Sequence, residues 1–169
     1  EADRTYLELL ARQRALALER LRMQEVETAS RRETELLYAL TSACNESGDA
    51  ATIYEASLVA VEHGSHSDRS AILLLDDAGV MRFAASHGLS PAYRVAVEGH
   101  SPWSRETTDP QPVLVNDTEA DDAWAAFRDT FRAEGLRALA FVPLVHRGVL
   151  LGKFMLYRDA PRAFRPAEI

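Results

Sequence analysis

The segment from His100 to Trp103 holds the side chains best suited to binding a small molecule. It reads His-Ser-Pro-Trp, in which serine suits a helix N-cap and proline suits the first helical turn. These residues predict a short helix that begins at Ser101. Unpaired N–H groups and a partial positive charge at a helix start attract anionic or polar ligands. Alternatively, Trp103 fills the core and His100 lies in a loop.

Three aromatic residues and two charged ones downstream could also contribute to a site. Trp124, Phe127 and Phe131 are spaced i, i+3, i+7 on a predicted helix. They would roof a cavity for an aromatic ligand or pack in the core. Arg137 directly precedes a predicted strand and would meet a carboxylate or phosphate, or stay solvated. Asp117 follows another predicted strand, where its carboxylate suits capping of the next turn.

Other residue patterns argue against catalysis and metal binding. His63 and His66 have a spacing that could suit a metal, but the Gly- and Ser-rich loop around them is a poor scaffold for one. The single cysteine, Cys44, cannot by itself form a disulfide, a zinc site or an iron–sulfur site. No Gly-x-Ser-x-Gly, P-loop or paired His/Glu metal motif occurs. We therefore expect no metal site and no enzyme activity.

Composition predicts one domain plus an extension. The chain has 169 residues, 47% of them hydrophobic, and a net charge of −7 that disfavours binding to nucleic acid or to anionic lipid. No apolar stretch approaches the roughly 20 residues that span a bilayer. The start lacks both Met and a leader sequence. We therefore expect a cytoplasmic piece of a longer protein, without membrane contact.

The first quarter of the chain predicts a long dimerising helix. Residues 3–46 contain neither Pro nor Gly and are rich in strong helix formers. Leu7, Ala11, Ala15 and Leu18 form a narrow apolar stripe at helical spacing. Such a stripe needs a partner helix, so we expect a coiled coil that joins two copies in a homodimer.

The rest of the chain predicts an α+β domain built on an antiparallel sheet. Alternating apolar runs bounded by turn residues predict strands, and capped segments at helical spacing predict helices. Gly135 is expected to end the last helix, and Gly148 to take a positive φ in the last hairpin. Helices are predicted at residues 50–63, 90–97 and 123–134, and strands at 71–75, 80–86, 112–115, 138–145 and 149–157.

Several of these segments, read in order, resemble the GAF domain family. The most specific pattern is Leu136-Arg-Ala-Leu-Ala-Phe-Val-Pro-Leu followed by Gly148-Val-Leu-Leu-Gly, with Val113-Leu-Val-Asn-Asp upstream. The resemblance covers about residues 33–169. Within it, the segment from Gly99 to Asp117 is similar to GAF units in sensor histidine kinases. The resemblance implies an antiparallel sheet of five or six strands with helices on both faces. One face would carry a ligand pocket, and the other would carry helices that dimerise and transmit signal.

The resemblance also guides the choice of site residues and cofactors. Asp117 follows the end of a strand, at a place where members of the family present polar groups to their ligand. Covalent bilin is disfavoured because Cys44 lies on the wrong segment, and haem because residues 116–136 contain no histidine. The cysteines needed to reduce methionine sulfoxide and the cyclic-nucleotide signature are also missing. The cofactor is unknown, and the candidate pocket residues are His100, Ser101, Trp103, Asp117, Trp124, Phe127 and Arg137.

These expectations combine into one functional hypothesis with one alternative. Residues 1–32 would be a signalling helix that resembles the closing helix of a preceding module. Residues 33–169 would be a GAF domain without its own C-terminal output helix. The chain would be a non-catalytic sensory module of a two-component system, working between neighbouring sensor and output modules, while the full-length parent would be a histidine kinase or another signalling enzyme. The alternative is a ligand-free dimerising spacer.

Overall fold

The computed structural model describes residues 14, 19–20, 23–24, 49–165 and 168. The described residues before position 49 are helical and exposed. Most of the expected N-terminal helix, its apolar stripe, Cys44 and the expected domain boundary at residues 32 and 33 lie outside the described residues. The coiled coil and the dimer therefore stay predictions.

Five strands form one antiparallel sheet in the order β2-β1-β5-β4-β3. Strand β5 is central, and it pairs with β1 along one edge and with β4 along the other. This sheet confirms the predicted antiparallel architecture. The strands are β1 Arg69–Leu75, β2 Met81–His87, β3 Val113–Val115, β4 Ala138–His146 and β5 Val149–Arg158.

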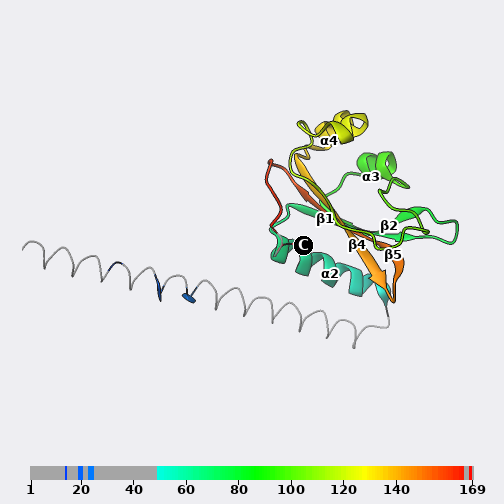
Figure 1. Ribbon diagram of the computed structural model, residues 1–169, viewed down its shortest axis with the longest axis horizontal. Coiled ribbons are helices and arrows are strands. Elements are labelled where there is room, and N and C mark those ends of the chain that lie inside the picture. The colour runs from blue at the N-terminus through cyan, green and yellow to red at the C-terminus, as the bar shows by residue number, and fades with distance from the viewer. Residues whose placement is uncertain (1–13, 15–18, 21–22, 25–48, 166–167, 169) are drawn as a thin grey trace, which may run out of the picture. The chain divides into compact units, whose positions relative to one another are not determined.

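Helices cover both faces of the sheet, as expected (Figure 1). The long helix α2, Ala50–Ser65, packs on β1 and β2. The opposite face carries α3 (Pro91–Val97), the 3-10 helix η1 (Asp122–Phe127) and α4 (Arg128–Glu134). No helix in the described part of the chain is long and apolar enough to cross a membrane.

Local signals set most of these element ends. The Ser90 side chain caps α3 by accepting the N–H of Tyr93 at 3.1 Å. Gly135 ends α4 with a φ of 77°, and the next residue, Leu136, donates its N–H to the carbonyl of Phe131. Between β4 and β5, Arg147 and Gly148 both have positive φ, as a two-residue hairpin turn requires. The predictions for Gly135 and Gly148 are confirmed.

Two predicted helices differ from the structure. No helix begins at Ser101: its Oγ accepts the N–H of Trp103 at 3.2 Å, but residues 101–112 continue as turns and bends. The Trp103 side chain is buried in the core, and the positive φ of Asp109 together with Pro110 and Pro112 keeps the later part of this segment from becoming helical. The helix predicted for residues 123–134 is instead η1 followed by α4, because Trp124 has a non-helical backbone.

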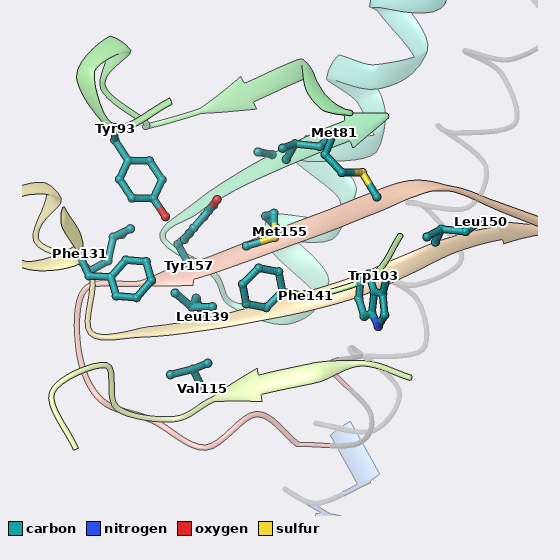
Figure 2. Packing of buried hydrophobic residues seen from close by; sticks show 13 residues of the cluster. Met81, Tyr93, Trp103, Val115, Phe131, Leu139, Phe141, Leu150, Met155 and Tyr157 are labelled. Carbon is teal, nitrogen blue, oxygen red and sulfur yellow. The ribbon is translucent and has the colours of Figure 1, made fainter. Parts of the chain in front are cut away.

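Alternation along β5 divides the core into two clusters. Met155 and Tyr157 face α3 and α4 in the larger cluster, which Figure 2 shows from close by. Leu156 points the other way and packs with Ala138, Ala140, Phe164 and, from α2, Val61. Successive β5 side chains thus reach opposite layers of the domain.

Beyond β5, one buried ion pair fastens the last part of the domain. The Arg158 guanidinium donates to the carbonyl of Ser65 at 2.6 Å and pairs with Glu168 at 3.2 Å; both charged side chains are only 3% exposed. Burial alone would raise the pKa of Glu168. The Arg165 N–H and the guanidinium groups of Arg165 and Arg158 outweigh that effect and lower its pKa to about 2.

Gly152 allows β5 to pair closely with β1. A Cβ at this position would overlap the backbone oxygen of Leu73 and lie 2.9 Å from the Cα of Leu74. Any side chain must therefore push the two central strands apart.

We expect Gly152→Ala to destabilise the domain by roughly 1–3 kcal/mol, because the clash is with backbone that cannot rotate away. Denaturant unfolding measures the loss. Gly64→Ala is the matched control: a Cβ there has no neighbour within 4 Å, and the helical site favours alanine. Equal stability of the two variants would contradict the close-approach argument.

Candidate ligand-binding site

A cavity of about 150 Å³ lies against the β1–β5 face of the sheet that carries α3, η1 and α4. Its floor comes from Leu73 of β1 and from Lys153, Met155 and Tyr157 of β5. The cavity sits in the larger core cluster, where neighbouring side chains are apolar. A small organic molecule would be enclosed mainly by carbon surface, as is usual in ligand pockets.

Aromatic rings form most of the wall. Trp124 stacks on Phe141 with centroids 4.9 Å apart and an interplanar angle of 19°. Phe127 lies 6.0 Å from Phe131 at 29°, and the His100 ring meets Phe127 edge-on at 5.0 Å. Offset and edge-on contacts of this kind are favourable and fix ring positions. The wall therefore presents an ordered aromatic surface to whatever occupies the cavity.

Lys153 places a cation in this apolar surrounding. Its side chain lies over the Phe141 ring, 5.0 Å from the centroid, and its Nζ donates to the carbonyl oxygen of His100 at 2.6 Å. The residue is 2% exposed, and burial lowers the pKa of its ammonium group to about 8. Across the described residues, no carboxylate forms an ion pair with it.

Two phenols complete the polar lining. Tyr93 and Tyr157 meet edge-on with centroids 5.8 Å apart, and their hydroxyl groups point toward each other (Figure 2). Burial raises the pKa of both hydroxyls. Both phenols therefore stay neutral at physiological pH.

Four of the seven candidate residues line the cavity: His100, Ser101, Trp124 and Phe127. Trp103 does not; it is 8% exposed and lies at the other end of the core cluster from Tyr93 (Figure 2). The structure therefore brings together the residues around position 100 and those of η1, which are distant in the sequence.

Asp117 and Arg137 instead bind each other, outside the cavity lining. The Arg137 guanidinium lies 3.0 Å from the Asp117 carboxylate. Asp117 also accepts the N–H of Glu119 at 3.0 Å, which is the turn-capping role. The N–H of Glu119 and the guanidinium of Arg137 lower the pKa of Asp117. Their ion pair fastens the loop after β3 to the start of β4.

Among the cavity-lining residues that sequence reasoning did not select, Lys153 is the one with a charged side chain. The available signal was its type and place: it is the only lysine in the chain and stands in a predicted strand of apolar residues. Alternation puts it on the same face as Met155 and Tyr157. The described residues contain no group of three or more His, Cys, Asp or Glu side chains that could bind a metal ion.

Comparison with known proteins identifies the family. The family model described as GAF domain matches residues 49–169, most of the chain. The chain therefore belongs to the GAF domain family, which confirms the resemblance seen in the sequence. No curated protein matches the chain significantly.

Solved structures agree with this assignment. A domain assigned to a two-component sensor histidine kinase of Sinorhizobium meliloti 1021 is 42% identical, with a TM-score of 0.66, covering 72% of this chain and 82% of that chain. The GAF domain of a phosphoenolpyruvate-protein phosphotransferase from Coxiella burnetii is 15% identical (TM-score 0.60; 80% and 83% covered). The blue-light-absorbing form of the Thermosynechococcus elongatus PixJ GAF domain is 19% identical (TM-score 0.55; 70% and 75% covered). The last two show the shared fold alone.

We expect Lys153→Met to stabilise the domain at pH 7 by roughly 1–3 kcal/mol, because it removes a buried charge and keeps a side chain of similar length. Between about pH 8 and 10.5 the unfolded chain keeps a proton that the folded chain releases. Wild-type stability therefore rises with pH in this window, and the advantage of the variant shrinks. Denaturant unfolding at pH 7 and pH 9.5 measures both effects.

The single lysine provides an independent check of the same prediction. Lysine-selective ¹³C labelling yields one side-chain NMR signal, whose titration midpoint should lie at about 8. A midpoint at the ordinary value of 10.5, or a variant less stable than wild type at pH 7, would contradict the burial of an uncompensated charge.

Proposed function

We propose that this chain is a non-catalytic sensory module that binds a small organic ligand in the cavity. The observation that carries the proposal is the aromatic cavity itself, with Lys153, Ser101 and His100 as its polar groups. An apolar pocket with a few convergent polar groups is the usual form of a binding site. The 42% identity to a domain assigned to a sensor histidine kinase supports a role in signal transduction.

The arrangement of the wall offers a route from binding to signalling. Cavity residues come from separate elements, including Tyr93 of α3, Phe127 of η1 and Lys153 of β5. A ligand that contacts them all favours one relative packing of these elements over another. Because β5 side chains alternate, a shift at Tyr157 also displaces Leu156 in the cluster that includes α2 residue Val61.

The output step of the proposal is a homodimer through the N-terminal helix. In this proposal, a change in the packing of the two helices passes the signal to neighbouring modules of the same polypeptide. The alternative is a spacer that dimerises and relays motion without a ligand. The sensory module binds a ligand in the cavity and the spacer does not, so a binding experiment distinguishes them.

We expect at least one member of a panel of small organic acids, amides, amines and nucleotides to raise the unfolding temperature. The shift should be roughly 5–10 °C at a hundredfold excess over Kd, because a ligand that binds only the folded state stabilises it. The control is Val97→Phe, which fills the cavity from α3 and should abolish the shift. No shift with any compound, together with only the bare protein mass in native mass spectrometry, would favour the spacer.

We expect the full chain to sediment as a dimer. Leu18→Glu should shift it towards monomer, because it puts a charge into the apolar stripe that the partner helix would cover. Arg20→Gln, outside the stripe, serves as the control and should leave the dimer intact. A wild-type chain that stays monomeric at high concentration would refute dimerisation through this helix.

A further inference from the structure

The cavity contains one full charge and no group of opposite sign. Lys153 is only 2% exposed. Its Nζ carries three N–H donors but has one hydrogen-bond partner among the described residues, the carbonyl of His100. Among the described residues that line the cavity, none is an aspartate or glutamate. A buried ammonium group without a counter-charge is unfavourable, and an incoming anion would relieve that cost.

The other groups in the lining do not compete for this role. Ser101 is neutral, and its Oγ already accepts the N–H of Trp103. The phenols of Tyr93 and Tyr157 are held protonated by burial, with pKa values raised above the usual range. The His100 imidazole packs edge-on against Phe127. The ammonium group of Lys153 is thus the strongest attachment point for a charged ligand.

Cavity size and wall chemistry limit the rest of the ligand. The volume of about 150 Å³ is comparable to that of an apolar protein cavity that holds one benzene molecule. It is below the range of pockets that enclose drug-sized molecules, roughly 300–1,000 Å³. Trp124 and Phe141 stack on each other, and together with the neighbouring Phe127 they line the cavity with ordered aromatic surface against which a single ring can pack.

We propose that the cavity selects a small monocyclic aromatic carboxylate, with its carboxylate on Lys153 Nζ and its ring among Trp124, Phe127 and Phe141. This inference rests on the proposed ligand-binding function and names its ligand class. An ammonium–carboxylate hydrogen bond is roughly twice as strong as a neutral one, so charge decides between ligands of equal shape.

The test compares three probes of nearly the same shape by calorimetry: benzoate, benzamide and benzylamine. Wild type should bind benzoate roughly tenfold or more tightly than benzamide, and benzylamine weakest of the three. The Lys153→Met variant should lose the preference for benzoate and keep its affinity for benzamide. Val97→Phe should weaken all three, which locates binding in the cavity.

The single lysine signal gives a second readout on the unchanged protein. Benzoate should shift the ¹³C resonance of Lys153 and raise its titration midpoint, because a bound anion favours the ammonium form. Benzamide should do neither. This measurement keeps the test valid if either variant folds poorly.

The outcomes separate the two proposals. If benzamide binds as well as benzoate, or if Lys153→Met leaves benzoate affinity unchanged, anion selection is overturned while ligand binding in the cavity stands. If none of the three probes binds but another compound of the broader panel does, the aromatic carboxylate class is wrong. If no compound binds at all, the proposed function fails, and this inference fails with it.

Discussion

The pairing of β5 with strands on both of its edges is the constraint on which the rest of the domain depends. Hydrogen-bonded to β1 and β4, and covered on both faces, β5 has no exposed edge to distort. Its alternation then sends Lys153 and Tyr157 towards one layer and Leu156 towards the other. Close pairing is possible only because Gly152 carries no side chain. The cavity floor is therefore set by main-chain geometry before any ligand contact.

Sequence reasoning succeeded where a local residue determines the structure. Ser90 caps α3, Gly135 ends α4 and Gly148 turns the last hairpin, and each acts within a few residues of its own position. The helix predicted at Ser101 shows the limit of such reasoning. Its serine and proline are sound local signals, but Trp103 is buried in the distant core and the segment does not become helical.

In the candidate site, too, some residues could be chosen from the sequence alone, while the roles of others depend on tertiary packing. His100 and Phe127 were chosen by type and lie in the cavity, whereas Asp117 and Arg137 neutralise each other across 20 residues of sequence. That pairing depends on how the loop after β3 meets β4, which residue types alone do not reveal. Lys153 was missed because a cation in an apolar strand gains its importance only from the register that places it under the cavity.

The ion pair of Arg158 and Glu168 has a practical consequence for the design of expression fragments. Arg158 belongs to the central strand, but its counter-charge arrives ten positions later, after an irregular segment. Trimming a fragment at the end of β5, where the sheet is already complete, would remove both the Glu168 carboxylate and the Phe164 ring that covers the Arg158 guanidinium group, and would expose the apolar cluster around Leu156. The smallest autonomous unit therefore extends through residue 168, further than the strands alone suggest.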